Sequence, residues 1–477
     1  MAKLFIGGEW VDSKNKKTIE IRNPATGEVV DTAPEGTAQD ADQAVEAAEK
    51  AFKEWSAMAP DARGKILFKA AELIAAHKQE IGVLLTKEQG KPVSEAVREI
   101  EHFLHGLEYY AGVATKIRGA HVPLSQPGLQ GIVLKQPIGV CGAIVAWNYP
   151  LTLMGRKISP ALVAGNTVIV KPARTTPLAT LKCMEFFAEA GLPKGVLNVV
   201  TGPGNVVGEA LVRHPKVRRV GFTGETQTGK RLMAAASEQI KPLTLELGGS
   251  DPMIVCDDAD LKRATTAASI GRFYNCGQSC LAVKRLYLFE SIAEAFIQEL
   301  ITKVQRLKIG NGLQEDVRIG PLHTARQREE VEAQVQDAVK RGAKILTGGK
   351  RPEGAEYQKG FFYLPTLLTN VAEDSRIVRE ECFGPALPIF RVKDLDEAIA
   401  KANDSIYGLG ASIWTKDLAK AMKAAEKLEA GNVWINSLHI GFDEMPFGGV
   451  KQSGLGREHG LEVLEYYLET KGVVLGI

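Results

Sequence analysis

Several features are absent from this sequence of 477 residues, and each absence argues against a class of protein. No apolar run approaches the roughly 20 residues that span a bilayer, which argues against a membrane protein. The opening residues, MAKLFIGGEW, lack the basic and apolar regions of a signal peptide, so we expect a cytoplasmic location. Basic and acidic residues number 59 and 57 without long blocks of one sign, which argues against nucleic-acid or anionic-lipid partners.

Cysteine is scarce for a chain of this length. The cysteines form no C-x-x-C pair, so neither a disulfide framework nor a structural zinc site is predicted. We expect reduced thiols and no metal centre. The six cysteines are Cys141, Cys183, Cys256, Cys276, Cys280 and Cys382.

The hydrophobic pattern predicts an α/β fold. Between residues 138 and 256, short apolar runs alternate with helical stretches, which is typical of βαβ units around a parallel sheet. A second alternating region follows from about 250 to 435, with helices predicted near 258–274, 291–306 and 326–341. Two α/β domains with a cleft between them are the simplest interpretation.

Two local patterns are more specific. Residues 37–57 have one apolar helical face, and Thr37-x-x-Asp40 resembles a capping box at its start. Residues 117–137 gain proline and glycine and alternate like a hairpin, so they form either a surface excursion or an assembly element.

The stretch GRFYNCGQSCLAVK contains two thiols four positions apart, Cys276 and Cys280. They could be a metal or disulfide pair, core packing, or include a nucleophile. If the preceding helix continued through Cys280, both sulfurs would share a face, but His214 and His323 show no ligand spacing, so metal binding is the weakest interpretation. A free cysteine is most often a small buried hydrophobe, and a nucleophile needs a base because little thiolate forms at neutral pH.

Two polar residues follow apolar strands and could assist a thiol. Glu246 precedes Gly248-Gly249, where burial would raise its pKa toward that of a general base; the alternative is a strand-end carboxylate facing water. Asn148 precedes Pro150 by two residues, so its amide could donate to an oxyanion or could simply organise the turn.

Glycine-rich turns offer a possible phosphate site. Gly202, Gly204 and Gly208 form G-x-G-x-x-x-G, one residue longer than the usual dinucleotide fingerprint, and Gly224 and Gly229 open a predicted helix. Ordinary turn glycines explain each pattern alone. Together, in consecutive strand-helix units, they favour phosphate at helix N-termini.

Seven ordered motifs make the chain resemble the aldehyde dehydrogenase superfamily over essentially its whole length. The motifs are W-N-Y-P at 147–150, V-K-P-A at 170–173, F-T-G at 222–224, E-L-G-G at 246–249, G-Q-S-C at 277–280, E-E-C-F-G-P at 380–385 and P-F-G-G-V-K-Q-S-G-L-G-R-E from 446. The resemblance implies a Rossmann-like cofactor domain (1–116 and 138–248), an α/β catalytic domain (249–448) and a small β oligomerisation element (117–137 and 465–477). It also implies a homodimer or homotetramer.

The resemblance assigns roles to the three candidate reactive residues. Cys280 becomes the nucleophile, Glu246 the base that activates water, and Asn148 with the Cys280 backbone N–H the oxyanion hole. The implied reaction is NAD(P)-dependent oxidation of an aldehyde to a carboxylic acid through a thiohemiacetal and a thioester. The alternatives are a CoA-acylating enzyme, against which Glu246 argues, and a catalytically silent structural or binding homologue, against which the intact trio argues.

The resemblance also implies a cofactor site. It places Lys171 and Glu381 on the riboses, Trp147 and Phe383 against the nicotinamide half, and Gly224 near the pyrophosphate. The candidate cofactor residues further include Gly204, Gly208, Phe222 and Arg174.

Two departures from the family pattern concern the cofactor. Arg174 stands where NAD-preferring relatives commonly carry glutamate, and its charge would attract a 2′-phosphate, so we expect NADP to be accepted and preferred over NAD. The alternative is that Arg174 turns into solvent and discriminates nothing. Glu225 follows Gly224 where many relatives have serine, and we expect its carboxylate to point away from the phosphate.

The substrate pocket contains a third departure. Arg156 occupies a position where relatives acting on apolar aldehydes often have tryptophan, so it could pair with an anion on the substrate; the alternative is an ion pair within its helix. Tyr274 replaces a second arginine typical of succinate-semialdehyde enzymes. A small polar or acid-bearing aldehyde is expected, of the succinate semialdehyde, lactaldehyde, glycolaldehyde or glyceraldehyde type. The other residues expected to shape the pocket are Tyr149, Ser279, His439 and Phe442.

Overall fold

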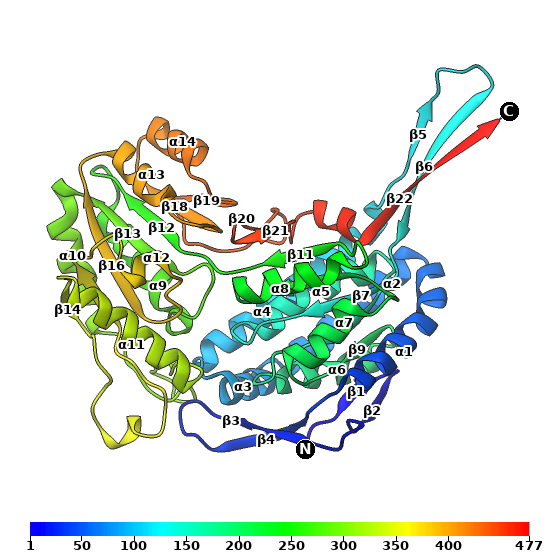
Figure 1. The fold of residues 1–477 in the computed structure, drawn as a ribbon, viewed down its shortest axis with the longest axis horizontal. Coiled ribbons are helices and arrows are strands. Elements are labelled where there is room, and N and C mark those ends of the chain that lie inside the picture. The colour runs from blue at the N-terminus through cyan, green and yellow to red at the C-terminus, as the bar shows by residue number, and fades with distance from the viewer. Residues whose placement is uncertain (477) are drawn as a thin grey trace.

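Two mostly parallel sheets form the body of the protein in Figure 1, a computed structural model that describes residues 1–476. The strand order of the larger sheet is β2 (Glu9–Val11), β1 (Leu4–Ile6), β9 (Leu197–Val199), β8 (Thr167–Lys171), β7 (Val140–Ile144), β10 (Val217–Thr223), β11 (Leu243–Glu246) and β21 (Gly454–Leu455). The strand order of the second sheet is β14 (Lys344–Thr347), β15 (Thr366–Thr369), β16 (Ala386–Val392), β13 (Val283–Phe289), β12 (Asp251–Val255), β18 (Gly410–Trp414) and β19 (Asn432–Ile435).

In the larger sheet, the five adjacent strands β9, β8, β7, β10 and β11 run parallel to one another. In the second sheet, the six adjacent strands β15, β16, β13, β12, β18 and β19 do the same. The alternating sequence pattern predicted this parallel arrangement. Their side chains are buried on both faces, which is why β7 and β8 read as continuous apolar runs. Cys141 and Ala143 of β7 join one core, and Val140 and Ile144 join the core on the opposite face.

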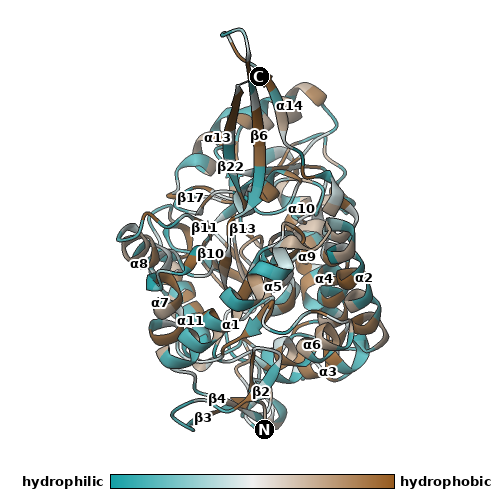
Figure 2. Ribbon diagram, turned by 90° about the vertical axis from the view of Figure 1, so that its right-hand side faces the viewer, coloured by the Kyte–Doolittle hydropathy of each residue, from teal (hydrophilic) through white to brown (hydrophobic). Residues whose placement is uncertain are grey.

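Helices cover both faces of the larger sheet and surround the second. Figure 2 shows that they carry both hydrophobic and hydrophilic residues, as covering helices do. The helices are α1 (Ala38–Ala57), α2 (Pro60–Ala76), α3 (Lys78–Gln89), α4 (Val93–Val113), α5 (Pro150–Val163), α6 (Leu178–Glu189), α7 (Glu209–Arg213), α8 (Thr226–Ser237), α9 (Leu261–Phe273), α10 (Glu290–Gln305), α11 (Ala325–Lys340), α12 (Arg376–Arg379), α13 (Leu395–Asn403) and α14 (Leu418–Lys427).

The helices predicted near 258–274, 291–306 and 326–341 are confirmed as α9, α10 and α11. The capping box at Thr37 and Asp40 is also confirmed at the start of α1.

A three-stranded antiparallel sheet projects from the body in Figure 1. It consists of β5 (Ala120–Pro123), β6 (Leu129–Pro137) and the C-terminal β22 (Leu468–Gly476), which pairs with β6 along its whole length. The hairpin predicted for residues 117–137 is therefore present. Two strand pairs lie outside these sheets: β3 (Thr18–Arg22) with β4 (Val29–Pro34), and β17 (Tyr407–Gly408) with β20 (Val450–Lys451).

The strand order positions the site. From β7 the chain continues to β8 and β9 on one side, and then β10 and β11 lie on the other side of β7. Ligands of open α/β sheets bind at such a reversal, at the carboxyl ends of the strands. Trp147 and Asn148 follow β7 there, and Gly224 follows β10.

Two kinds of feature are absent from residues 1–476. No helix within residues 1–476 combines the length and apolar character that crossing a bilayer requires. Over the same residues, no cluster of His, Cys, Asp or Glu side chains could hold a metal ion.

Candidate active site

A cavity of about 1290 Å³ lies at the carboxyl ends of the strands, lined by residues that follow both sheets. It brings together most of the residues predicted from the sequence. The candidates that line it are Asn148, Cys280, Trp147, Gly224, Glu381, Phe383, Tyr149, Arg156, Tyr274, Ser279, His439 and Phe442. The candidates outside its lining, within the described chain, are Glu246, Lys171, Arg174, Gly204, Gly208 and Phe222.

The two neighbouring thiols lie in different surroundings. Helix α9 ends at Phe273, so the helix does not continue through Cys280, and the two sulfurs do not share a helical face. The φ angles of Asn275, Cys276 and Gly277 are 51°, 56° and 72°, which is left-handed backbone. Cys276 is buried in the core of the second sheet, whereas Cys280 is partly exposed and lines the cavity.

Side chains from other elements hold this left-handed segment. The Asn275 backbone N–H donates to Glu95 Oε2 at 2.8 Å, and Gln278 Nε2 donates to the Asn275 carbonyl at 3.0 Å. Left-handed residues other than glycine cost roughly 1–2 kcal/mol each, so contacts of this kind must compensate. The strain lies immediately before Cys280.

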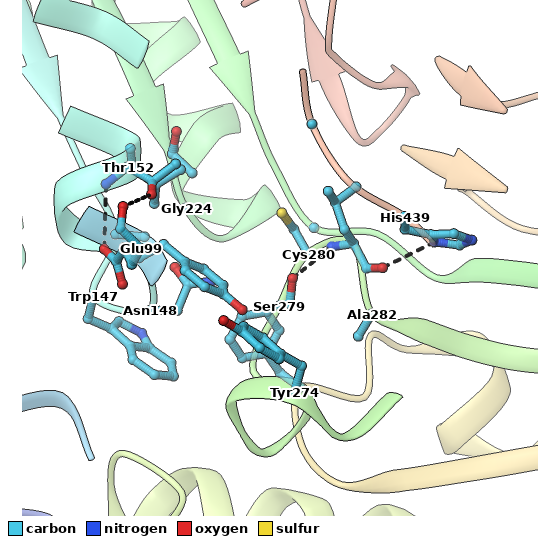
Figure 3. Close-up of a pocket in the computed structure, with 18 of the residues that line it drawn as sticks. Glu99, Trp147, Asn148, Thr152, Gly224, Tyr274, Ser279, Cys280, Ala282 and His439 are labelled. Atoms are coloured by element: carbon cyan, nitrogen blue, oxygen red, sulfur yellow. Dashed lines mark hydrogen bonds between the residues drawn. The ribbon is translucent and has the colours of Figure 1, made fainter. Parts of the chain in front are cut away.

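Asn148 is fixed by groups on both sides of the cavity (Figure 3). Its Nδ2 donates to the Gln278 carbonyl at 3.1 Å. Its own carbonyl accepts from Lys91 Nζ at 2.7 Å and from Asn275 Nδ2 at 3.1 Å. Because a side-chain amide has two N–H donors, the second stays available for a ligand oxygen.

A fully buried ion pair supports the turn that carries Asn148. Lys91 pairs with Glu99, and neither side chain is accessible. Glu99 Oε1 accepts the backbone N–H of Leu151 at 2.9 Å, which satisfies one of the free donors in the first turn of α5. The Lys91 ammonium also lies 4.0 Å from the centre of the Tyr149 ring. Motif reasoning missed this pair because Lys91 and Glu99 read as ordinary helix-flanking charges.

The Cys280 thiol is protonated at neutral pH in this environment. Burial raises the pKa of Cys280 to about 12, although the positive charges of Lys284 and Arg156 oppose the shift. Lys284 Nζ donates to the Cys280 carbonyl at 2.7 Å, and this hydrogen bond fixes the backbone of the loop at Cys280. In Figure 3 the sulfur lies on the Asn148 side of this loop, and His439 lies on the other side.

Glu246 is buried beside the cavity rather than in its lining. Burial, and then the neighbouring charge of Glu458, raise the pKa of Glu246 well above its usual range. Its Oε1 has no hydrogen-bond partner within residues 1–476, and a side chain at Gly448 would come within 2.9 Å of that oxygen. Glu458 is in turn paired with Lys157 at 2.7 Å. The alternative of a strand-end carboxylate facing water is therefore wrong.

The opposite end of the cavity is walled by aromatic rings. Trp147 stacks on His323 with ring centres 4.5 Å apart and planes 8° apart. Phe383 meets Trp147 edge-on at 5.6 Å. Flat apolar walls of this kind suit a planar ring system.

Glu381 is held rigidly at the centre of the cavity. Its Oε1 accepts the Gly249 N–H at 3.1 Å and pairs with Lys284 Nζ at 3.0 Å. A side chain at Gly248 would collide with the Glu381 carboxylate, so glycine at 248 makes room for this residue. Exposed Glu225 lines the cavity nearby, and its side chain makes no capping hydrogen bond to α8.

Lys171 and Arg174 lie just beyond the lining. The Lys171 ammonium is buried and makes no hydrogen bond or ion pair within the described residues; burial and the charge of Arg174 lower its pKa to about 8. Arg174 is half exposed and its guanidinium pairs with Glu35 at 2.6 Å. Arg174 therefore does not simply turn into solvent, because its guanidinium forms an ion pair with the Glu35 carboxylate.

Arg156 is an unpaired cation in the substrate part of the cavity. Its guanidinium lies 4.9 Å from the centre of the Phe447 ring, and its buried Nε has no hydrogen-bond partner. No carboxylate within residues 1–476 lies close enough to form an ion pair with it. The alternative of an ion-paired Arg156 within its helix is wrong.

Two predicted pocket residues differ in what they offer a ligand. The His439 ring is buried, stacks on Trp434 at 4.7 Å and bonds the Leu281 carbonyl through Nδ1 at 3.1 Å, so it braces the nucleophile loop. Phe442 is 51% exposed at the mouth of the cavity.

One face of α4 was missed at the sequence level. Arg98, His102 and His105 line the cavity and recur at helical spacing. The signal was visible as basic residues on one face, but an amphipathic pattern alone does not reveal that the polar face borders a cavity.

Comparisons with known proteins bear on the site as a whole. The model of the aldehyde dehydrogenase family matches residues 10–473. A betaine aldehyde dehydrogenase of Bacillus subtilis is 44% identical over 472 residues, which cover 98% of this chain and 96% of that protein. A glutarate-semialdehyde dehydrogenase of Pseudomonas putida is 42% identical over 475 residues, covering 100% and 98%. The structure of a Staphylococcus aureus betaine aldehyde dehydrogenase in complex with NAD+ is similar with a TM-score of 0.97 at 40% identity, covering 99% and 94%.

The environment of Cys280 predicts the pH dependence of its alkylation. Because its raised pKa lies above the working range, the thiolate fraction and the iodoacetamide rate should rise about tenfold per pH unit between about pH 7 and pH 10, without a plateau. Rates are measured by quenched mass spectrometry. Cys276→Ser should behave like the parent and Cys280→Ser should not react, because the other thiols are buried. A plateau below about pH 8 would contradict the predicted environment.

Proposed function

The chain belongs to the aldehyde dehydrogenase family, as its motifs predicted, and from this premise we propose which residues carry the reaction and which aldehydes enter. The protein is an NAD(P)-dependent oxidoreductase that acts on aldehydes. In the proposed assignment Cys280 is the nucleophile, Glu246 is the general base, and Asn148 with the Cys280 backbone N–H forms the oxyanion hole.

Attack on the aldehyde begins at Cys280. The thiol gives its proton to water in the cavity, the sulfur bonds to the carbonyl carbon, and the carbonyl oxygen becomes the oxyanion of a thiohemiacetal. The second N–H of Asn148 and the Cys280 N–H donate to that oxygen; neither is engaged elsewhere in the described chain. One such donor lowers the barrier by roughly 3 kcal/mol.

Release of the product needs a base. A nicotinamide held by Trp147 and Phe383 would supply the acceptor for the aldehyde hydrogen and its two electrons, so that a thioester would remain on Cys280. Glu246 then takes a proton from water, the water oxygen attacks the thioester carbon, and the sulfur leaves. Its raised pKa brings Glu246 nearer to the range of a base that works at neutral pH. A CoA-acylating enzyme has no need of such a carboxyl, so turnover should not require CoA.

The residues around the cavity suit a dinucleotide. The aromatic walls of Trp147 and Phe383 accommodate the nicotinamide. The Glu381 carboxylate accepts hydrogen bonds from ribose hydroxyls, the Lys171 ammonium donates to them, and Gly224 precedes α8 beside the pyrophosphate. The proposed cofactor domain is residues 1–116 and 138–248, and the proposed catalytic domain is 249–448. Gly204, Gly208 and Phe222 lie outside the cavity lining, so in this proposal they would support the cofactor site without lining the cavity.

Arg156 is the observation that carries the proposed substrate. An arginine without a partner in a shared cavity with Cys280 is costly unless a ligand supplies the counter-charge. A carboxylate on the aldehyde supplies it with two hydrogen bonds, whereas the hydroxyls of lactaldehyde, glycolaldehyde or glyceraldehyde supply none of the charge. The proposed substrate is therefore an acid-bearing semialdehyde of the succinate or glutarate type.

The same charge argues against a quaternary ammonium substrate. Betaine aldehyde carries a positive charge, and Arg156 would repel it inside a cavity of low dielectric. We therefore do not propose betaine aldehyde as the substrate, despite the similarity to betaine aldehyde dehydrogenases.

The projecting sheet is the proposed assembly element, formed by residues 117–137 and 465–477. Edge strand β22 exposes unpaired backbone groups, and Val474 is 64% exposed on it. Covering such an edge with a second copy of the chain gives a homodimer or homotetramer.

Replacement of Arg156 tests the substrate class. Arg156→Met should lower kcat/KM for succinate semialdehyde about 10- to 100-fold, the worth of hydrogen bonds to a charged group, and lower kcat/KM for butanal far less. Butanal has the same carbon chain without the carboxylate. Steady-state kinetics on both aldehydes make the comparison, with Arg218→Met, an exposed arginine paired with Glu469, as the matched control. Equal losses on both aldehydes would reject the substrate role.

Cofactor choice depends on Arg174 in the same way. Arg174→Glu should lower kcat/KM for NADP relative to NAD by at least about tenfold, because a carboxylate replaces the group that would attract the 2′-phosphate. Glu35→Gln should shift the ratio the other way, since it frees the arginine from its present partner. Cofactor titrations of the parent and both variants give the ratios. An unchanged NADP preference in Arg174→Glu would contradict the proposed role of Arg174 in binding the 2′-phosphate.

A further inference from the structure

The aldehyde end of the cavity holds more basic groups than the chain itself neutralises. Arg98 and His102 on α4 line the cavity together with Arg156 on α5. Across the described part of the chain, none of these three side chains makes a hydrogen bond or an ion pair. Arg98 and His102 are exposed and Arg156 is partly buried, so all three side chains are accessible to a ligand of opposite charge in the cavity.

Most of the carboxylates nearby already have a partner. Asp443, which also lines the cavity, lies 2.7 Å from a ring nitrogen of each of two histidines. The engaged carboxylates are Glu99 with Lys91, Glu101 with Lys78, Asp443 with His105 and His459, and Glu458 with Lys157.

His102 differs from the two arginines because it can change its charge. It lies one turn after Arg98 on the same face of α4, so their side chains are neighbours. Burial, then the charges of Arg156 and Arg98, lower the pKa of His102. Asp443 from the facing loop and Glu101 on α4 act in the opposite direction but do not reverse the shift. Without a ligand, His102 is therefore neutral at neutral pH.

A bound anion reverses this balance. A carboxylate that neutralises Arg156 and Arg98 removes the repulsion that keeps His102 neutral, and it offers the imidazolium an acceptor. We infer that His102 binds the anionic end of the substrate as an imidazolium, so that an acid-bearing aldehyde enters together with a proton and a neutral aldehyde does not. This inference rests on the proposed function of Arg156 and adds a specificity-determining residue to the same site.

The sign of the pH dependence follows from linkage. Proton uptake on binding means that the pKa of His102 is higher in the complex than in the free enzyme. The added affinity is complete below the free-enzyme pKa and is lost as the pH rises through the pKa of the complex. Preference for an acid-bearing aldehyde should therefore fall with rising pH across the neutral range, by up to about tenfold per pH unit for a single proton.

The experiment compares two aldehydes as a function of pH. The holoenzyme is assayed with succinate semialdehyde and with butanal between about pH 5.5 and pH 8.5, and the ratio of their kcat/KM values is plotted. The ratio should fall with pH in the parent and stay flat in His102→Asn. His77→Asn, which changes an exposed histidine outside the cavity, should follow the parent. Calorimetry of succinate binding in two buffers of different ionisation enthalpy should record proton uptake in the parent and its loss in His102→Asn.

The outcomes separate this inference from the proposed function. A parent that prefers succinate semialdehyde with a ratio independent of pH, and with no proton uptake, would overturn the role of His102 alone. A parent with no preference for succinate semialdehyde at any pH would overturn the acid-bearing substrate as well. A sloping ratio that persists in His102→Asn would assign the titration to another group and would also overturn the inference.

Discussion

The hydrogen bond from the Asn148 side chain to the Gln278 carbonyl joins the two halves of the active site. Asn148 follows strand β7 of the larger sheet, and Gln278 lies two residues before Cys280, between helix α9 and strand β13 of the second sheet. The bond works only if both partners are rigid. Lys91 and Glu99 fix the turn on one side, and Glu95 and Asn275 hold the left-handed loop on the other. The distance between nucleophile and oxyanion donor is therefore set by buried polar contacts rather than by either sheet alone.

Burial affects the proposed reactive groups through their pKa values and affects Arg156 through its missing hydrogen-bond partner. It raises the pKa of the Cys280 thiol to about 12 and raises the pKa of the Glu246 carboxyl above its usual range. It also leaves the Arg156 Nε without a hydrogen-bond partner, beside a cavity that the Cys280 side chain lines as well. The proposed nucleophile and the proposed anion-binding group therefore share one cavity.

The sequence pointed to the candidate reactive residues but not to the residues that support them. Cys280, Glu246 and Asn148 stand in short motifs at strand ends, where local pattern is informative. Lys91 lies 57 residues from Asn148 and reads as a surface lysine, because contacts between distant segments leave no local pattern. The end of α9 at Phe273 agrees with the helix predicted near 258–274, but the left-handed backbone of residues 275–277 was not predicted, because tertiary hydrogen bonds rather than local propensity hold it.

The central claim is that the aldehyde becomes a thioester on Cys280 and that Glu246 removes it. Rapid mixing of Glu246→Gln with succinate semialdehyde and NADP, followed by acid quench and intact mass analysis, tests this claim directly. The predicted result is a burst of about one NADPH per chain and a mass gain of one succinyl group, mapped to Cys280 by peptide sequencing. Asn148→Ala in the same background should form the adduct about 100-fold more slowly. Sustained turnover with no adduct, or an adduct on Cys276, would contradict the account.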